Sequence, residues 1–95
     1  MLYALICTDK PKSVDLRMSV RPDHVGYLQG LGDRLKAGGP FLNNEGSPCG
    51  SLVVIEAGSK QEAEAIAADD PYAKSGLFDS VEIKQWNWIL KNPEE

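Results

Sequence analysis

Apolar residues recur along this chain with two different periods, and these periods predict strands and helices. The run at 2–7 is apolar on both alternating faces, which predicts a strand buried on both sides. A similar run at 51–56 predicts another strand, and a short strand is expected at 40–42. The last strand is expected from near Ser80 to Ile89. The pattern therefore indicates four strands.

The first helical segment is expected to begin at 21–23 and to run to about Ala37, where Gly38-Gly39-Pro40 ends it. Spacings of four, three and four residues place one stripe of side chains on a single face of this helix, the face that turns toward the core. That stripe contains the only histidine of the chain and consists of His24, Leu28, Leu31 and Leu35.

The second helical segment has a sequence signature at each end. Ser59 is a natural N-cap, and Glu62 three residues later completes a capping box. The helix is expected to end at Asp70, before Pro71. Its apolar stripe of Ala63, Ile66 and Ala67 continues into Asp70, so a carboxylate also lies on a core-facing stripe.

The order of these elements, βαββαβ, predicts a ferredoxin-like α+β fold, with an antiparallel sheet and both helices on one face. In that topology the start of the first helix and the end of the second share one end of the domain. His24 and Asp70 are therefore expected to meet there. The connections at 9–20, 43–50 and 71–79 lie at the same end and surround the pair.

Two helices cover only one face of the sheet, yet both faces of the strands at 2–7 and 51–56 are apolar. A homodimer packed through the open face is the expected remedy, since monomers rarely expose large apolar patches. In the last strand the apolar pattern changes phase near Lys84-Gln85, which indicates either a bulge or a change of the buried face. Trp86 and Trp88 are then interpreted as interface residues.

The composition restricts the class of protein. The chain of 95 residues fits one domain, 1–95, and its 42% hydrophobic and 25% charged residues are typical of globular proteins. A net charge of −4 with scattered basic residues argues against a nucleic-acid partner. No apolar run reaches the roughly 20 residues of a membrane helix, so we expect a cytoplasmic protein. Cys7 and Cys49 lack the spacing of a metal site, and we expect no metal and no cofactor.

The candidate chemistry centres on the histidine. A carboxylate beside an imidazole fixes its tautomer and stabilises the imidazolium, which makes His24 a plausible general base and Asp70 its orienting group. Asp70 at a helix C-terminus would also need a compensating cation, either His24 or Arg21. Arg21 is a candidate for holding an anionic substrate, Ser51 for donating a hydrogen bond to substrate, and Tyr72 for lining a pocket.

Each of these residues also has a purely structural interpretation. His24 alone is an ordinary packing residue at the edge of a core, and Asp-Pro at 70–71 is ordinary helix punctuation. Arg21 fits a surface position, Ser51 a cap or turn, and Tyr72 a plug of the core. The functional interpretation depends on whether the fold brings His24 and Asp70 together around an open pocket.

Several short motifs, taken in order, resemble the YCII-related (YciI-like) proteins over nearly the whole chain. They are Arg21-x-x-His24-x-x-x-Leu28, Gly39-Pro40, Gly50-Ser51, Asp70-Pro71-Tyr72, Ser75-Gly76-Leu77-Phe78 and the closing Trp86. The resemblance implies a ferredoxin-like domain of the dimeric α+β barrel type, with an active site centred on His24 and Asp70. Gln85 departs from the proline that many relatives have at this position.

The resemblance also implies a type of reaction. One relative is a dehydrochlorinase that acts on a chlorinated hydroxyhydroquinone, and the fold is similar to that of muconolactone isomerase. We therefore expect a small-molecule enzyme of the isomerase or lyase type, in which His24 abstracts a proton from a cyclic or aromatic-derived substrate. The alternatives are a non-catalytic module that binds a small ligand and a purely structural dimer module. If Tyr72 and Phe78 fill the end of the domain where His24 and Asp70 meet, the purely structural module is favoured.

Overall fold

Four strands and three α-helices make up the fold in the computed structural model, which describes residues 1–94. The last residue of the domain expected at 1–95 thus lies outside the described residues. The elements are β1 (Leu2–Asp9), α1 (Val14–Gln29), the 3-10 helix η1 (Gly32–Arg34), β2 (Leu35–Leu42), β3 (Pro48–Glu56), α2 (Lys60–Ala68), α3 (Pro71–Lys74) and β4 (Phe78–Trp86).

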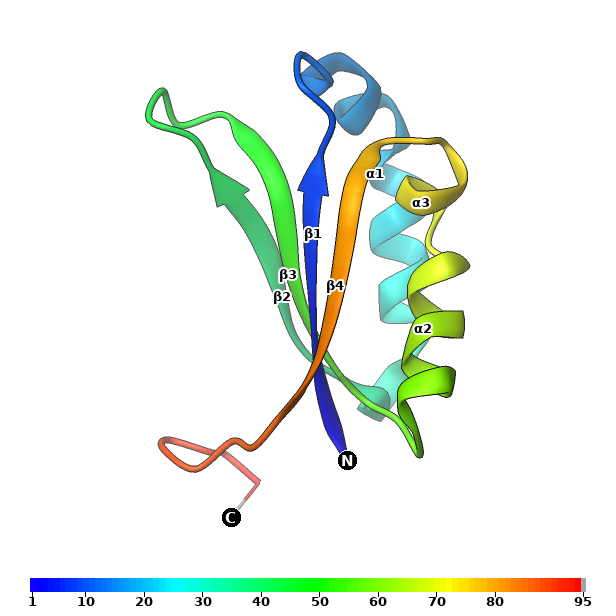
Figure 1. Ribbon diagram of the computed structural model, residues 1–95, viewed down its shortest axis with the longest axis vertical. Helices are drawn as coiled ribbons and strands as arrows, with labels where there is room; N and C mark the ends of the chain where they lie inside the picture. The colour runs from blue at the N-terminus through cyan, green and yellow to red at the C-terminus, as the bar shows by residue number, and fades with distance from the viewer. Residues whose placement is uncertain (95) are drawn as a thin grey trace.

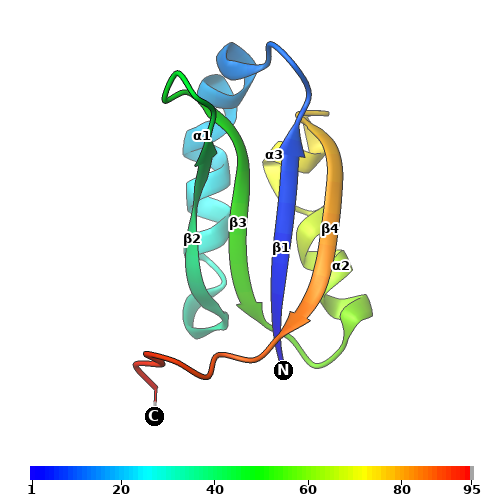
Figure 2. The same cartoon turned by 60° about the vertical axis from the view of Figure 1, so that its left-hand side comes forward.

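The strands form one antiparallel sheet in the order β2-β3-β1-β4, and the α-helices pack on one face of it (Figure 1). Figure 2 shows the strands side by side in this order, with the helices behind them. This is the ferredoxin-like α+β arrangement, so the fold class expected from the element order is confirmed.

The core lies between the sheet and the helices because alternate residues of the two central strands point to that side. Tyr3, Leu5 and Cys7 of β1 are buried there, beside Val53 and Ile55 of β3. The helices contribute a second set of buried residues: Leu28, Ala63, Ile66 and Ala67. The stripe predicted for the second helix is thus buried.

The helix predicted at 21–37 has different bounds. α1 already begins at Val14, and Pro22 lies inside it rather than in its first turn. It ends at Gln29 because Gly30 and Gly32 follow, and Gly32 has the left-handed φ of +62° that stops a helix. Residues 38–40, expected to end the helix, instead lie within the edge strand β2, where proline is tolerated.

Two members of the predicted stripe therefore reach the core from outside α1. Leu31 lies in the turn after the helix, and Leu35 begins β2 opposite Ile55. Both still pack against the buried cluster. The hydrophobic pattern correctly identified core residues but not the element that carries them.

The bulge considered near Lys84-Gln85 is absent. The register of β1 and β4 runs without interruption from Leu2 opposite Trp86 to Thr8 opposite Ser80, and it shifts only between Thr8 and Asp9. The apolar pattern changes phase because Trp86 lies on the open face with Leu2. β4 ends at Trp86, not Ile89, so Trp88 lies beyond the strand.

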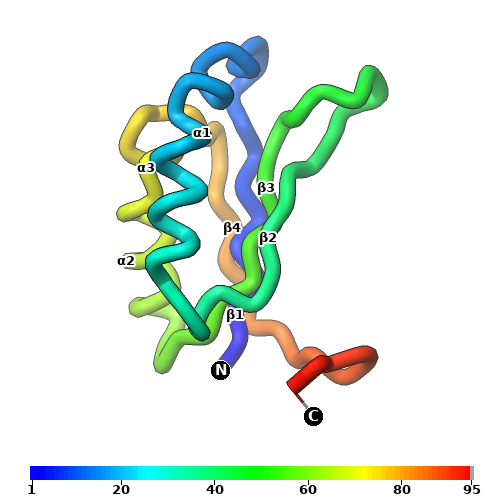
Figure 3. Tube along the Cα trace, turned by 180° about the vertical axis from the view of Figure 1, so that it is seen from behind, coloured from blue at the N-terminus to red at the C-terminus, as the bar shows by residue number. Residues whose placement is uncertain are grey.

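The backbones of α1 and the β2–β3 hairpin diverge toward the end of the domain where the hairpin turns (Figure 3). Within residues 1–94 no helix combines the length and the apolar character that crossing a membrane requires.

Candidate functional site

His24 and Asp70 are in direct contact, as the topology predicted. Nδ1 of His24 lies 2.8 Å from Oδ1 and 2.9 Å from Oδ2 of Asp70. Both residues are buried, with exposed fractions of 8% and 6%. Because an ionised carboxylate only accepts hydrogen bonds, Nδ1 carries a hydrogen and its N–H donates a hydrogen bond to Asp70. Nε2 of the neutral ring is then an acceptor.

Nε2 is the atom of this pair that a ligand can reach. It makes no hydrogen bond within residues 1–94, and no buried side-chain nitrogen or oxygen of these residues lacks a partner. Nε2 therefore keeps some contact with solvent, and the His24 ring lines a cleft. The arrangement places a base at the surface of the cleft and its orienting carboxylate behind it.

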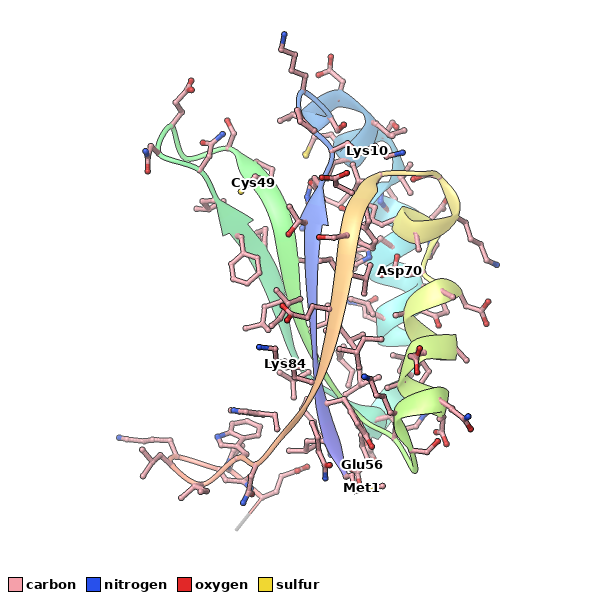
Figure 4. All side chains as sticks on the ribbon, viewed as in Figure 1. Met1, Lys10, Cys49, Glu56, Asp70 and Lys84 are labelled. Atoms are coloured by element: carbon pink, nitrogen blue, oxygen red, sulfur yellow. The ribbon has the colours of Figure 1, made fainter. Side chains whose placement is uncertain are left out.

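Asp70 does not lie at a helix C-terminus, so that prediction is wrong. α2 ends at Ala68, and Asp70 is the N-cap of the next helix, α3. Its Oδ1 accepts a hydrogen bond of 2.9 Å from the backbone N–H of Tyr72. Negative charge is favoured at a helix N-terminus, and Pro71 is well placed at the first helical position. The N-cap position therefore accounts for the negative charge of Asp70 without a compensating cation. Asp70 lies on the helical side of the sheet (Figure 4).

Tyr72 packs directly against the histidine. Its ring stacks on His24 with centroids 3.8 Å apart and planes 15° apart, and Phe78 meets it edge-on at 6.0 Å. Tyr72 is 1% exposed, yet it lines the cleft. Burial raises the pKa of Tyr72, and the nearby Arg17 and Arg21 oppose this rise. The phenol therefore keeps its proton at neutral pH.

The cleft itself has a volume of about 520 Å³ and lies between α1 and the strands β2 and β3. A volume of this size fits a small-molecule ligand. The purely structural interpretation requires Tyr72 and Phe78 to fill this end of the domain, but a cleft remains there. Four polar side chains of the wall contact one another: His24 stacks on Tyr72, and Arg17 contacts both Tyr72 and Ser51. Arg21 and Gln29 are the other polar residues that line the cleft. Apolar residues form much of the rest: Val25, Leu28, Leu35, Pro40, Leu42, Pro48 and Val53.

Two of the predicted substrate-binding residues have contrasting environments. Arg21 is exposed on α1 and borders the cleft. Ser51 is 2% exposed on β3, and its hydroxyl accepts a hydrogen bond from Nη2 of Arg17. The structure therefore brings all five predicted site residues to one end of the domain, four of them on the cleft wall and Asp70 behind His24.

Arg17 and Asp9 form a buried ion pair that the hydrophobic pattern does not predict. Nη1 of Arg17 lies 3.0 and 2.8 Å from the two carboxylate oxygens of Asp9, and its Nη2 also donates to the carbonyl of Gly50 at 2.9 Å. The Cζ atom lies 4.7 Å from the centre of the Tyr72 ring. Burial raises the pKa of Asp9, and Arg17 opposes that rise.

A sequence signal for Arg17 exists. Arg17 and His24 are seven residues apart, which is two helical turns, so both lie on the same helix face. A helix that begins at Pro22 makes the segment 9–20 a polar connection, and this boundary hides the stripe. Once α1 begins at Val14, the inward stripe contains Arg17, His24 and Leu28.

Comparison with known proteins gives matches over nearly the whole chain. The model of the YCII-related domain matches residues 1–87. Protein YciI from Escherichia coli O6:H1 and that from Shigella flexneri are each 39% identical to this chain over 98 residues, covering 95% of this chain and 100% of the relative. An uncharacterized protein from Haemophilus influenzae is 30% identical over the same shares.

Two solved structures are informative in different ways. The 5-chloro-2-hydroxyhydroquinone dehydrochlorinase from Burkholderia phenoliruptrix AC1100, in complex with 2,5-dihydroxybenzoquinone, has a TM-score of 0.84 and 29% identity, covering 92% of this chain and 94% of that one. A dimeric ferredoxin-like protein of unknown function from Jannaschia sp. CCS1 has a TM-score of 0.55 and 16% identity, with shares of 90% and 98%. The second match concerns the fold alone.

Proposed function

The chain belongs to the YCII-related family, and from this premise we propose that it is a small-molecule enzyme in which His24 abstracts a proton from a bound substrate. The observation that carries the proposal is the hydrogen bond of 2.8 Å from Nδ1 of His24 to Asp70. This bond leaves the lone pair of Nε2 available at the cleft. A buried carboxylate behind the ring also stabilises the imidazolium that forms when Nε2 takes a proton.

The proposed step breaks an acidic O–H or C–H bond of the substrate. Its electron pair stays on the substrate, and the proton moves to Nε2. In an isomerase the imidazolium returns this proton to another atom of the same molecule. In a lyase a leaving group departs with its own bonding pair, and the proton passes to solvent. Neither course needs an oxidant or a reductant.

The dehydrochlorinase supports a cyclic, aromatic-derived substrate. Its name describes the loss of HCl from a chlorinated hydroxyhydroquinone, and its ligand is a hydroxyquinone. The cleft of the present chain has the volume for a ring of this kind, and apolar side chains form much of its wall. Arg21, Ser51 and Tyr72 are the proposed substrate-binding residues.

The experiment compares wild type with His24→Gln. Both are incubated with 5-chloro-2-hydroxyhydroquinone while released chloride is measured, and a panel of hydroxyquinones and cyclic lactones is screened by thermal shift. Loss of a general base lowers kcat by about 10²- to 10⁴-fold. Gln29→Ala is the control, because Gln29 borders the same cleft without contacting Asp70. It should retain turnover and ligand binding.

The outcomes separate the two remaining functions. Turnover that persists in His24→Gln contradicts proton abstraction by His24. A compound that stabilises the wild-type protein and is recovered unchanged indicates the non-catalytic alternative, in which His24 and Asp70 only hold a polar ligand. Stabilisation lost in His24→Gln still assigns the ligand to this cleft.

We also propose that the chain forms a homodimer through the open face of its sheet. Phe41, Leu52 and Trp86 are 41%, 39% and 41% exposed, although they are large apolar residues. Their strand partners place them on the side away from the helices: Phe41 opposite Gly50, Leu52 opposite Ile6 and Trp86 opposite Leu2. A second copy of the chain is the proposed partner, because a symmetric contact sets the same apolar face of each copy against the other.

A further inference from the structure

The buried group of Asp9, Arg17 and Ser51 has no part in the proton transfer proposed above. All three side chains are nearly inaccessible, with exposed fractions of 9%, 4% and 2%. They come from three elements, β1, α1 and β3, and they meet beside the cleft. Removing charged groups from water is costly even when they form an ion pair, so this buried network calls for an explanation.

The hydrogen bonds of this group fix the direction of the Ser51 hydroxyl. A guanidinium has donors and no acceptor, so Ser51 must accept from Arg17 and cannot donate to it. Asp9 and the carbonyl of Gly50 hold the same two Arg17 nitrogens in place. The Ser51 hydroxyl donates to no other atom of residues 1–94. Its hydrogen is therefore available to a molecule in the cleft, whose wall includes Ser51.

We propose that Ser51 is a specificity-determining hydrogen-bond donor, and that the cleft selects ligands that combine an acidic hydroxyl with a carbonyl or phenolate oxygen. The acidic hydroxyl gives up its proton, which Nε2 of His24 takes, so that an oxyanion lies beside the imidazolium, and the second oxygen receives the hydrogen of Ser51. Enols and hydroxyquinones have both groups on one planar framework. The role of Nε2 in this proposal rests on the proposed function. The hydrogen bond from Ser51 to the ligand is the new part.

Arg17 is a positioning residue in this scheme. Its positive charge next to the Ser51 oxygen polarises the O–H bond and strengthens the hydrogen bond that Ser51 donates. Asp9 in turn holds the guanidinium. Arg17 itself has little capacity left for a ligand, because Asp9, Gly50 and Ser51 occupy both of its Nη atoms.

The experiment measures binding, not turnover, by calorimetric titration at pH 7.5. The probes are 2,5-dihydroxybenzoquinone, which carries carbonyls and whose acidic hydroxyls are ionised at this pH, and hydroquinone, whose hydroxyls stay protonated and which has no carbonyl. Ser51→Ala should weaken binding of the quinone by about tenfold or more, as expected when a hydrogen bond to a charged oxygen is lost. It should change hydroquinone binding by less than about threefold, since a phenol oxygen accepts more weakly. Ser51→Thr retains the hydroxyl and should restore binding.

Arg17→Met tests the positioning role through a double-mutant cycle. If Arg17 acts through Ser51, the double variant Arg17→Met, Ser51→Ala binds the quinone no more weakly than Ser51→Ala alone. Additive losses would assign Arg17 a separate, structural role. Arg17→Met leaves Asp9 unpaired and can fail to fold, in which case Asp9→Asn replaces it in the cycle. Ser51→Ala and Ser51→Thr still carry the main test.

The inference and the proposed function fail in different ways. Wild-type protein that does not bind 2,5-dihydroxybenzoquinone overturns the inference, as does quinone binding that is equal in wild type and Ser51→Ala. Quinone binding that depends on Ser51, without turnover of any substrate, supports the inference and removes the enzymatic proposal. Turnover that depends on His24, together with quinone binding that does not depend on Ser51, supports the enzymatic proposal and overturns the inference.

Discussion

At the scale of single residues, Asp70 has two tasks that a substitution can separate. Its Oδ1 caps α3 through the N–H of Tyr72, and its charge faces Nδ1 of His24. Asparagine caps a helix about as well as aspartate but has no charge. Asp70→Asn should therefore fold normally and lower kcat/KM for a substrate by about tenfold or more, since orientation and charge both support the base.

The neighbouring Asp69 offers a matched control for this prediction. Asp69 is exposed at the end of α2 and forms neither contact. Asp69→Asn should retain activity and melting temperature. Equal activity in both variants would mean that the charge of Asp70 has no catalytic role, and a large fall in melting temperature for Asp70→Asn would assign it to the fold.

Cys7 gives a prediction about the pH dependence of stability. Burial, with smaller contributions from Asp70 and Asp9, raises the pKa of this thiol from 9.0 to about 12. Above pH 9 the unfolded chain loses the thiol proton while the folded chain keeps it. The stability from this group is complete below pH 9 and is lost as the pH rises toward 12, by at most about 1.4 kcal/mol per pH unit.

Denaturant unfolding at pH 8, 9 and 10 measures this slope. Cys7→Ala should show a smaller fall of the unfolding free energy with pH than wild type. Cys49→Ala is the control, because Cys49 lies half-buried near the hairpin end of β3 and should leave the slope unchanged (Figure 4). Parallel pH profiles for wild type and Cys7→Ala would contradict the assignment.

At the scale of elements, the pairing of β1 with β3 requires a glycine at position 50. A Cβ atom added to Gly50 would lie closer to the carbonyl oxygen of Cys7 than real Cβ atoms come, and that oxygen belongs to the backbone. The strands must separate to accept it. Gly50→Ala should cost about 1–3 kcal/mol, the range typical of overpacking.

Chemical denaturation compares this variant with Gly39→Ala. Gly39 lies in β2 and has no atom within 4 Å of an added Cβ, so its substitution should change stability far less. Similar unfolding midpoints for the two variants would show that the sheet adjusts without cost. Gly50 also supplies a carbonyl to Arg17, so the same variant should perturb the buried ion pair.

The elements also mark how far the sequence was informative. The order of the four strands and the two longer helices follows from the hydrophobic periods, because each period is a local property, and the meeting of His24 with Asp70 follows from the topology. The short helix α3 was not predicted, since 71–79 was expected to be a connection. The bounds of α1 did not follow, because Pro22 in a helix interior contradicts its usual preference and packing of the buried face overrides that preference. The ion pair of Arg17 with Asp9 was lost with that boundary.

At the scale of the whole molecule, the two faces of the sheet have different tasks. One face and the helices enclose the core and the cleft, while the other carries exposed apolar side chains. Cleft and open face lie on opposite sides of the same strands. Pairing through the open face would leave the cleft accessible, so assembly and ligand binding should be separable by substitution.

Leu52→Lys tests this separation. A lysine at the centre of the open face cannot be buried without a partner charge, so the variant should be a monomer in sedimentation experiments that give a dimer for wild type. Leu16→Lys is the matched control, since Leu16 is also 39% exposed but lies on α1. It should remain dimeric. A wild-type chain that sediments as a monomer, or a Leu52→Lys variant that stays dimeric, would exclude this face as the interface. If instead Leu52→Lys is monomeric and still binds 2,5-dihydroxybenzoquinone, the cleft of a single chain is sufficient for binding.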